Sequence, residues 1–508
     1  MFGRTETSAI IGIDGEPVMV EADYGDGLPS FDIVGFLGQE VREAKERVRS
    51  ALKNSGIRAE PGKLTVSLSP ADLRKSGNSF DLPIAMAILI AFGTIPQEMT
   101  DGFVFFGELA LDGTLRPIRG TLSHVILARS RGKKGCIVPK ENAREAAVFS
   151  DFPVYAFDSL REVLGFVLAP DERFREETVR EDWEEELFTE DFSEVLGQES
   201  VKRAAIVASA GMHGLLMIGP PGTGKTLTAR RIPTILPPLT NEERIECTKI
   251  ASVAGTLGTS GGLVRVRPFR SPHHTISTNG LVGGGVFPHP GEMSLAHNGV
   301  LFLDELPEFS KATLEVMRQP LEDRQVVITR THGSYLFPTR VMLVSAMNPC
   351  KCGYYPDRSR CKCSEMEVRK YLSRLSRPLL DRIDISIEVP RVSGEDLRRA
   401  EPGLDSETMR AMVQKAWEIE KERYAGEGIL FNSQLSGARI RKYCRLGEEE
   451  EEMLSDAFES LGLSARAHDR ILKVARTIAD LDASGEITKR HLAEAISYRQ
   501  LDRRYFGG

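Results

Sequence analysis

One stretch near the middle of the chain decides the fold around it: Leu215-Leu216-Met217-Ile218-Gly219-Pro220-Pro221-Gly222-Thr223-Gly224-Lys225-Thr226. Its first four residues are apolar, which predicts a short buried strand. The next eight fit the pattern G-x-x-x-x-G-K-[ST], in which backbone N–H groups and a helix N-terminus surround a phosphate. The spacing therefore predicts an ATP site in which Lys225 contacts the β- and γ-phosphates and Thr226 binds Mg²⁺. All eight residues, Gly219, Pro220, Pro221, Gly222, Thr223, Gly224, Lys225 and Thr226, are expected to contact the nucleotide.

Two later strands end in polar side chains of the kind that complete such a site. The apolar run 300–303 is followed by Asp304 and Glu305, and the run 341–346 is followed by Asn348. The carboxyl ends of parallel strands present ligands at one edge of a sheet. We expect Asp304 to hold Mg²⁺, Glu305 to orient the attacking water, and Asn348 to contact the γ-phosphate or that water.

Arginines further along the chain are candidates for stabilising the charge of the transition state. Arg382 is the candidate arginine finger, acting on ATP bound by a neighbouring subunit, with Arg374 as the alternative. An ordinary surface ion pair with an aspartate is the competing interpretation of Arg382, and it would contribute little. Arg466 opens a helix and is expected to reach back to the phosphates, with Arg470 one turn later as its alternative.

Composition divides the chain into four parts. Residues 1–168 mix strand-like and helical stretches, 169–190 are an acidic linker, 191–391 alternate strands and helices, and 392–508 have helical periodicity. The formal net charge is −7, so any contact with nucleic acid must come from local basic clusters. The chain shows no signal-peptide pattern and no apolar run of the roughly 20 residues that span a membrane, which predicts a cytoplasmic protein without a membrane partner.

Several motifs together resemble the magnesium-chelatase-related AAA+ proteins of the YifB/ComM family. They are 219–226, the run 267–274 (RPFRSPHH), 281–285 (LVGGG), 299–305, 347–350 (MNPC) and 464–466 (SAR). The resemblance implies an α/β multidomain fold with an AAA+ P-loop parallel-sheet core and a C-terminal helical lid. It also implies a homo-hexameric DNA helicase that promotes branch migration in homologous recombination during natural transformation, with recombination proteins as partners. Residues resembling the segment that lines the adenine pocket are Asp191, Val195, Gly197 and Gln198.

The first part of the chain resembles the proteolytic domain of Lon, which implies a ribosomal S5 domain 2-like α/β fold. The resemblance rests on Gly107-Glu108-Leu109, on residues 115–120 (LRPIRG) and on residues 138–142 (VPKEN). Lon uses a Ser–Lys dyad, and Ser79 occupies the nucleophile position. The lysine position falls on Leu122, which cannot take a proton. Ser123 and His124 are adjacent, so a Ser79–His124 arrangement stays open, but the domain is predicted to be a scaffold without peptidase activity.

Four of the seven cysteines crowd into a loop at residues 350–363. Cys350, Cys352, Cys361 and Cys363 are thiolate candidates for tetrahedral Zn²⁺, and the glycine and proline between the pairs allow a turn. The alternative is four reduced thiols that only pack. This loop also carries basic residues, which gives it a possible role in contacting DNA.

Two basic segments are candidates for lining the pore of a ring and binding DNA. One contains Arg267, Arg270 and His273; the other is a predicted hairpin over 326–337 that contains Arg330 and His332. In a hexamer each cation is repeated six times, which makes a basic ring from an acidic subunit. The leading hypothesis is therefore a DNA motor. The alternative is a chelatase-like ATPase that remodels a protein partner and has no DNA substrate.

Overall fold

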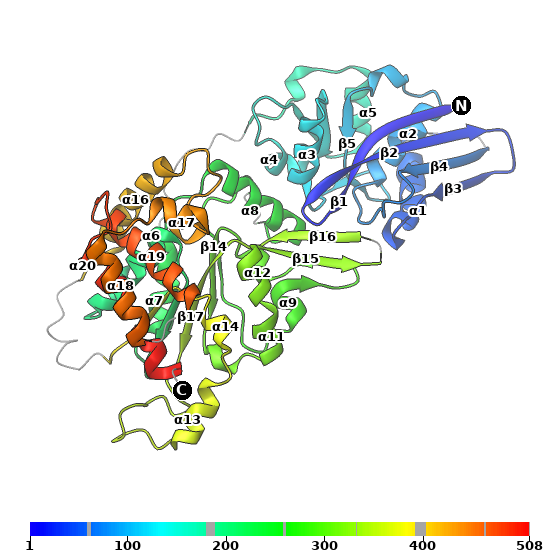
Figure 1. The fold of residues 1–508 in the computed structure, drawn as a ribbon. Coiled ribbons are helices and arrows are strands. Elements are labelled where there is room, and N and C mark those ends of the chain that lie inside the picture. Colours follow the sequence, from blue (N-terminus) through cyan, green and yellow to red (C-terminus); the bar gives the residue numbers. More distant parts are fainter. Residues whose placement is uncertain are drawn as a thin grey trace.

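The computed structural model describes residues 1–57, 62–178, 188–257, 261–331, 333–391, 403–461 and 464–506. Two bodies are visible, one built on the first third of the chain and a larger one on the remainder (Figure 1). His332, most of the second half of the acidic segment and residues 392–402 lie outside the described residues. No helix in the described ranges is long and apolar enough to cross a membrane.

The first body contains a seven-stranded mixed sheet in the order β3-β4-β2-β1-β5-β8-β9. Strands β1 and β2 form a long antiparallel hairpin, whereas β5, β8 and β9 run parallel to β1. Every residue of helix α2 is buried, and this explains why its sequence is apolar on all sides rather than amphipathic. The strands are β1 (Phe2–Ile11), β2 (Asp14–Gly25), β3 (Ser30–Val34), β4 (Lys63–Ser69), β5 (Phe103–Phe105), β6 (Glu108–Leu109), β7 (Leu115–Arg116), β8 (Gly135–Pro139) and β9 (Val154–Phe157); the helices are α1 (Gln39–Asn54), α2 (Asp81–Ala91), α3 (Thr121–Ser130), α4 (Ala143–Ala146) and α5 (Leu160–Leu168).

The second body is organised around a five-stranded sheet in the order β11-β14-β17-β10-β18, and every neighbouring pair is parallel. Strands β10 and β14 are buried along their whole length, as expected for a parallel sheet covered on both faces. Its strands are β10 (Leu215–Ile218), β11 (Phe269–Arg270), β14 (Gly299–Leu303), β17 (Val341–Met347) and β18 (Ile385–Glu388); its helices are α6 (Glu199–Gly211), α7 (Lys225–Arg231), α8 (Asn241–Ala254), α9 (Thr278–Val282), α10 (Glu292–Leu295), α11 (Lys311–Val316), α12 (Arg318–Asp323), α13 (Glu365–Leu372) and α14 (Arg377–Leu380).

The C-terminal part is helical, as predicted, and it shares a core with the sheet. Buried Ile471, Val474 and Ile478 of one helix recur at helical spacing and pack in the same cluster as Leu215 and Met217 of β10. The helices are α16 (Ser406–Arg423), α17 (Ala438–Tyr443), α18 (Glu448–Leu461), α19 (Ala465–Leu481) and α20 (Lys489–Ser497). The predicted fold class, an α/β multidomain protein with a parallel-sheet core and a helical C-terminal region, is confirmed.

The predicted hairpin is present as β15 (Gln325–Arg330) and β16 (Gly333–Pro338), with Val326 opposite Phe337. It extends from the second body toward β1 of the first (Figure 1). The approach is close, because a Cβ atom on Gly12 would lie 2.8 Å from the carbonyl oxygen of Leu336. A smaller hairpin, β12 (Gly283–Gly284) and β13 (His289–Pro290), lies beside it.

A buried hydrogen-bond network also joins the two bodies. The Ser252 hydroxyl of α8 accepts a bond from the Gly120 N–H at 2.8 Å and donates to the Glu145 carboxylate, which also accepts the Leu122 N–H at 2.8 Å. Lys249 of α8 pairs with Asp14 near by. Helix α8 is therefore fastened to the start of α3 by specific polar contacts rather than by surface apposition alone.

The acidic segment begins as part of the first body. Tyr155 forms a bridge with Arg175, and the ring of Phe174 packs 5.9 Å from that of Phe157. Its continuation over 179–187 lies outside the described residues, and the linker over 169–190 stays a prediction.

Candidate nucleotide site

The phosphate loop connects β10 to α7 with the backbone that its glycines allow. Gly224 has φ +85° at the start of α7, a left-handed conformation that side chains disfavour. A Cβ atom on Gly219 would lie 2.4 Å from the carbonyl oxygen of Val389, so the adjacent strand leaves no room for a side chain. Glycine is required at this position because the phosphate loop packs directly against the residue that follows strand β18.

Lys225 lies in the middle of this loop and is nearly buried, at 8% exposure. Its ammonium group donates to the carbonyl oxygens of Gly219 and Pro220 at 2.8 Å and to Asn348 Oδ1 at 3.2 Å. Burial lowers the pKa of Lys225 to about 8, although Asp304 and Glu305 oppose the shift. The lysine is therefore held where a phosphate is expected, and it lacks a carboxylate bonded directly to it among the described residues.

The predicted magnesium ligands are adjacent. The Thr226 hydroxyl donates to Asp304 Oδ2 at 2.7 Å, and the Glu305 N–H donates to Asp304 Oδ1 at 2.9 Å. A hydroxyl and a carboxylate are oxygen donors of the type that Mg²⁺ prefers when phosphates supply further ligands. These residues fit Mg²⁺, with Thr226 and Asp304 as the side chains that would hold it.

Glu305 projects from a left-handed backbone conformation, with φ +52°, and its side chain is 58% exposed. Non-glycine residues in this conformation are uncommon and concentrate at functional sites. Lys225, Thr226, Asp304, Glu305 and Asn348 thus lie together at the carboxyl edge of the parallel sheet. The sequence predicts this grouping because the five residues follow three strands, β10, β14 and β17, whose carboxyl ends lie at one edge of the sheet.

His274 is a site residue that the sequence interpretation missed in this role. Its Nδ1 atom lies 3.6 Å from Glu305 Oε2, and its ring lies 4.1 Å from that of His273. In the sequence it stands only as the last residue of the run 267–274. The signal was the RPFRSPHH run, but nothing in the sequence indicates which of the two imidazoles faces Glu305.

Gln198 links the expected adenine-binding segment to the phosphate loop. Its side-chain amide donates to the Thr223 carbonyl at 2.9 Å and to the Pro390 carbonyl at 3.2 Å. Val195, which precedes Gln198 in the same segment, is buried. Asp191 accepts a hydrogen bond from the Ser193 N–H. The segment before α6 is therefore positioned against the P-loop, where a nucleotide base would lie beside it.

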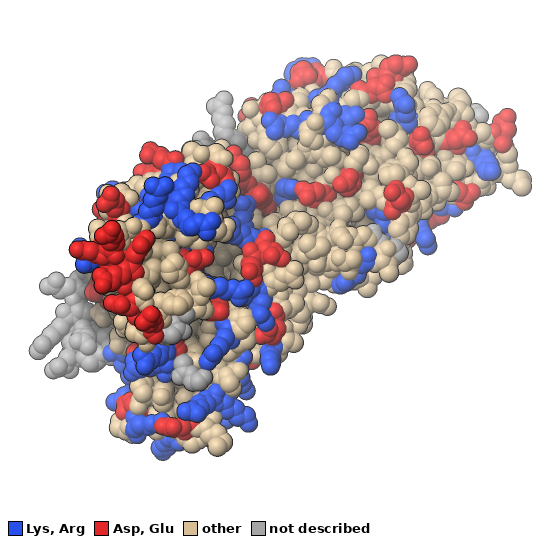
Figure 2. Space-filling view, in the orientation of Figure 1, with Lys and Arg blue, Asp and Glu red and all other residues tan. Residues whose placement is uncertain are grey.

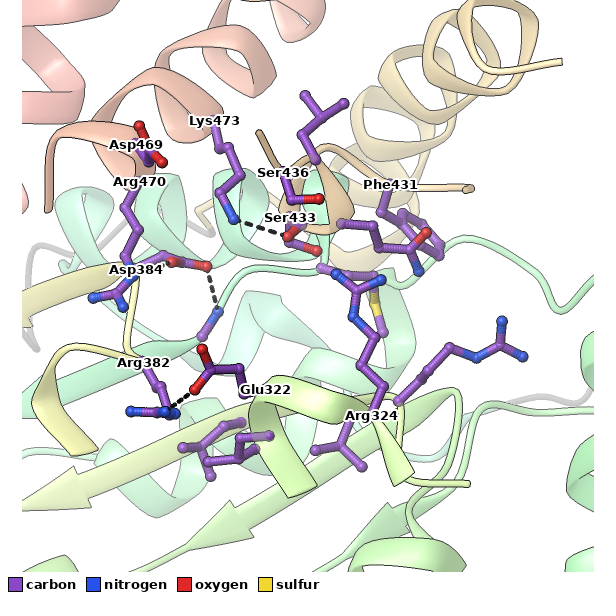
Figure 3. A pocket seen from close by; sticks show the side chains of 18 of the residues that line it. Glu322, Arg324, Arg382, Asp384, Phe431, Ser433, Ser436, Asp469, Arg470 and Lys473 are labelled. Atoms are coloured by element: carbon purple, nitrogen blue, oxygen red, sulfur yellow. Dashed lines mark hydrogen bonds and ion pairs between the residues drawn. The ribbon is translucent and has the colours of Figure 1, made fainter. Parts of the chain in front are cut away.

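A second group of charged residues surrounds a cavity of about 350 Å³ at the opposite edge of the sheet. Gly214, Asn298 and Val341 line it, and each lies at or just before the amino end of a strand. Helix α19 closes the other side (Figure 3). The cations that line the cavity are Arg324, Arg340, Arg382, Arg466, Arg470 and Lys473.

The cations in this cavity are only partly neutralised. Arg382 pairs with Glu322 and donates to the Pro378 carbonyl at 2.6 Å (Figure 3). Its Nε atom is buried without a partner among the described residues. Arg470 lies 3.4 Å from Asp384, and one of its terminal nitrogens also has no partner in the part of the chain that the structure describes. Burial raises the pKa of Asp384, but the hydrogen bond with His213 and the nearby cations outweigh it and hold that pKa well below its usual value.

The structure corrects the expectation for Arg466. Arg466 lines the cavity at the amino edge with Arg382, whereas Lys225 lies beyond the far end of β10. Four strand residues separate the two edges by roughly 13 Å. Arg466 and Arg470 therefore do not reach back to the phosphate site of their own chain. Arg374, the alternative finger, donates to Glu308 at 2.8 Å and so lies on the Glu305 side of the sheet, away from Arg382.

The predicted DNA-binding residues are separated by the fold. Arg267 is 4% exposed and forms a two-nitrogen ion pair with buried Glu243, so the prediction that it contacts DNA is wrong. Arg270 pairs with Glu292, while His273 and Arg330 are exposed. His332 lies outside the described residues. Arg267 was misassigned because a basic run does not reveal which of its members meets a carboxylate on a distant helix.

The cysteine loop lies beside α13 at the lower tip of the molecule, where Lys and Arg gather on the surface (Figures 1 and 2). The four sulfurs all lie within 4.8 Å of one another. The exposed cations of the loop are Lys351, Arg358, Arg360 and Lys362.

The Ser79–His124 arrangement is not formed. Both residues line a cavity of about 480 Å³ between the two bodies, but the His124 Nδ1 atom bonds to the Ser8 hydroxyl at 2.6 Å. The His124 ring stacks on Phe106, and burial lowers its pKa to about 3. Leu122, at the expected lysine position, is fully buried.

Comparisons with known proteins bear on the whole chain. Residues 191–397 match the family model for magnesium chelatase, subunit ChlI; residues 20–142 match that for subunit ChlI of Mg-chelatase, and residues 403–499 match the subunit ChlI C-terminal model. The chain is 42% identical over 498 residues to the uncharacterized protein YifB of Salmonella typhimurium, covering 98% of this chain and 97% of that protein. The chain belongs to the YifB/ComM family of magnesium-chelatase-related proteins.

Two further relatives refine this placement. The competence protein ComM of Haemophilus influenzae is 42% identical over 503 residues, covering 97% of each chain. A Lon protease of Chloroflexus aurantiacus is 28% identical over 170 residues, which is 31% of this chain and 20% of that protein. Membership of the family, the P-loop and the sheet topology identify the YifB/ComM-type chain as an AAA+ ATPase.

Proposed function

We propose that this AAA+ ATPase is a motor that acts on DNA as a homo-hexamer, in the manner of a ComM-type helicase that promotes branch migration in homologous recombination of incoming DNA. The observation that carries the proposal is the division of the catalytic groups between the two edges of one sheet. Lys225, Thr226, Asp304, Glu305 and Asn348 lie at the carboxyl edge, and Arg382 and Arg466 lie at the amino edge.

This division supports hydrolysis between subunits. A guanidinium about 13 Å of strand away from the phosphate loop cannot stabilise charge on a phosphate bound there. In a ring, the amino edge of one subunit faces the nucleotide of the next, and Arg382 and Arg466 then enter the same site together. Arg382 must leave Glu322 to do so, which makes that ion pair a resting position of the finger in the isolated chain.

The DNA part of the proposal draws on local charge and on the name of one relative, competence protein ComM. Arg330 is exposed near the tip of the β15–β16 hairpin, and His273 is exposed beside the nucleotide site. Six copies of each would make basic rings from a subunit of net charge −7. His332, at the hairpin turn, remains part of this proposal, as do recombination proteins as partners and a cytoplasmic location.

The cofactors are ATP and Mg²⁺, with Zn²⁺ as a second, structural metal. Lys225 would contact the β- and γ-phosphates, Thr226 and Asp304 would hold Mg²⁺, and Glu305 would polarise the attacking water. Cys350, Cys352, Cys361 and Cys363 would hold zinc. Val195 and Gln198 would lie beside the adenine.

The proposal is tested by comparing ATP turnover of the full chain with branched DNA, with single-stranded DNA and without DNA, with Glu305→Gln as the hydrolysis-deficient reference. We expect DNA to stimulate turnover and DNA binding to weaken steeply with salt, since phosphate contacts release counterions. Arg330→Ala should reduce both effects. Turnover that is identical in all three conditions would argue against a DNA motor while leaving the ATPase intact.

The second candidate is a chelatase-like ATPase that remodels a protein partner. It is favoured by the three matches to models of the magnesium chelatase subunit and by the burial of Arg267, which removes one cation from the expected pore. This candidate requires ATP turnover that responds to a protein and not to DNA. The same set of turnover measurements therefore separates the two.

A further inference from the structure

We infer that the cysteine loop, residues 350–363, is a zinc-binding element that positions the ATP site, so that ATP binding depends on a metal that takes no part in the chemistry. The inference rests on the proposed ATPase function and deepens it. Two independent observations carry it: the arrangement of the four sulfurs, and the contact between the loop and the phosphate loop.

The sulfur atoms have the spacing of a tetrahedral thiolate site. Cys350 Sγ lies 3.4 Å from Cys352 Sγ and 3.7 Å from Cys361 Sγ, and the Cys352 and Cys361 sulfurs are 3.6 Å apart. Four sulfurs at the usual Zn–S distance of about 2.3 Å stand roughly 3.8 Å from one another. A disulfide would require about 2.05 Å. The spacing therefore fits a shared metal and does not fit oxidised pairs.

Hydrogen bonds and nearby charges also suit a site of four thiolates. The Tyr355 N–H donates to Cys350 Sγ at 3.4 Å, a bond that stabilises a negatively charged sulfur. Zinc with four thiolates carries two negative charges, and Lys351, Arg358 and Lys362 are exposed around it. Arg358 also donates to the Cys363 carbonyl at 2.9 Å. These cations would balance the site.

The first part of the loop packs through Tyr354 and Tyr355, but its middle does not. Residues 356–360 are all exposed, so the middle of the loop contributes no hydrophobic core. Cys350 and Cys361 are instead buried and belong to the same hydrophobic cluster as Val368 and Leu372 of α13. The first cysteine pair follows strand β17, and the second precedes helix α13. A metal would therefore join the end of β17 to the start of α13.

The loop contacts the phosphate loop at Gly353, and it closely follows Asn348, a residue of the ATP site. Asn348, two residues before Cys350, accepts a hydrogen bond from Lys225. Gly353 lies against the phosphate loop so closely that a Cβ atom there would be 2.4 Å from Pro221 Cδ. Displacing the loop therefore moves Asn348 and removes the support of Pro221. A shift of about 1 Å at a catalytic site is enough to cost roughly 100-fold in rate.

The first measurement is the metal itself. Purified full-length protein should contain about one zinc per chain, and exchange for Co²⁺ should give the absorption bands of tetrahedral thiolate coordination. Cys361→Ser should lose the metal, whereas Cys136→Ala, which removes a buried thiol from β8, should retain it. Protein without zinc, whose four loop thiols react freely with a thiol reagent, would overturn the inference.

The second measurement is ATP binding and turnover after the metal is removed by a chelator, with Mg²⁺ restored after dialysis. We expect both to fall roughly 10- to 100-fold and to recover when Zn²⁺ is returned. Gly353→Ala keeps all four thiolates, so it should retain zinc and still weaken ATP binding. Reversible removal of zinc with unchanged ATP affinity and turnover would overturn the positioning role.

One further outcome separates this inference from the proposed function. Protein that contains zinc, gives the tetrahedral spectrum after exchange for Co²⁺ and never binds ATP would support the metal site and contradict the ATPase. Loss of ATP binding in Lys225→Ala with unchanged zinc content would support both, because that lysine contacts the phosphates and does not hold the metal.

Discussion

The carboxyl edge of the five-stranded sheet and the groove between the two bodies, which is the cavity lined by Ser79 and His124, both contain polar side chains, but these side chains have different kinds of partner. At the sheet edge, Lys225 bonds to two carbonyl oxygens and an amide, partners that a triphosphate can replace. In the groove, His124 is bonded to Ser8, stacked on Phe106 and 1% exposed. Polar residues in a cavity indicate chemistry only when their partners can be exchanged for a ligand.

The backbone at Leu122 also forms a structural contact at a position where the Lon resemblance expects a catalytic group. Its N–H bonds to Glu145, which bonds to Ser252 of helix α8 in the second body. Where the Lon resemblance expects a catalytic lysine, this chain has a contact that docks one body on the other. The start of α3 therefore docks the second body, whereas the sheet edge holds side chains whose partners a ligand can replace.

The largest expected effect comes from separating the two halves of the ATP site. Arg382→Ala should lower turnover by about 1000-fold while ATP binding is kept, because an arginine finger acts on transition-state charge. Lys225→Ala should be inactive because it removes the side chain that contacts the phosphates. Mixing the two variants should restore activity, since some interfaces then contain an intact lysine and an intact arginine.

Arg374→Ala is the matched comparison for this experiment. Arg374 lies on the Glu308 side of the sheet, so its loss should change turnover far less than the loss of Arg382. A mixture of Arg382→Ala and Lys225→Ala that stays inactive would contradict hydrolysis between subunits. A larger loss in Arg374→Ala than in Arg382→Ala would assign the finger to Arg374.

A smaller effect is expected from pH. Burial lowers the pKa of Lys225 to about 8 in the free protein, so the side chain loses its proton as pH rises through that value. Phosphate oxygens favour the charged form. ATP affinity should therefore be highest below pH 8 and fall about tenfold by pH 9, where roughly a tenth of the free protein is competent to bind.

Titration calorimetry in buffers of different ionisation enthalpy would measure this dependence, because proton uptake should accompany ATP binding near pH 8. Lys225→Arg provides the control, since a guanidinium remains charged throughout the range. Equal pH dependence in the wild type and in Lys225→Arg would show that another group titrates.

The sequence predicts the features that local patterns encode, but not those that depend on contacts between distant residues. The strands, the P-loop and the residues that follow each strand are local patterns, and parallel topology then brings Asp304, Glu305 and Asn348 together. The burial of Arg267 and the position of Arg466 are not local. The first depends on Glu243 of a distant helix, and the second depends on which edge of the sheet helix α19 packs against.

The hydrogen-bond network that joins the two bodies through Ser252 is expected to contribute modestly to the free energy of unfolding. Ser252→Ala leaves Glu145 and the Gly120 N–H without their shared hydroxyl partner, which should cost about 1–3 kcal/mol in unfolding free energy. Denaturant unfolding of the full chain measures this. Ser209→Ala is the matched control, because the Ser209 hydroxyl of α6 is buried with no hydrogen-bond partner within the described ranges, and its loss should be nearly neutral.

The smallest expected effect is at Ser79, and it tests the groove directly. Hydrolysis would need a base for the Ser79 hydroxyl, but Leu122 has no basic atom, and the imidazole of His124, whose pKa burial lowers to about 3, is bonded to Ser8. We therefore expect no cleavage of unstructured protein substrates, with or without ATP, and no change in turnover for Ser79→Ala. Ser76 lines the same cavity and provides the control. Cleavage that disappears in Ser79→Ala but survives in Ser76→Ala would show that the groove has peptidase activity with Ser79 as its nucleophile.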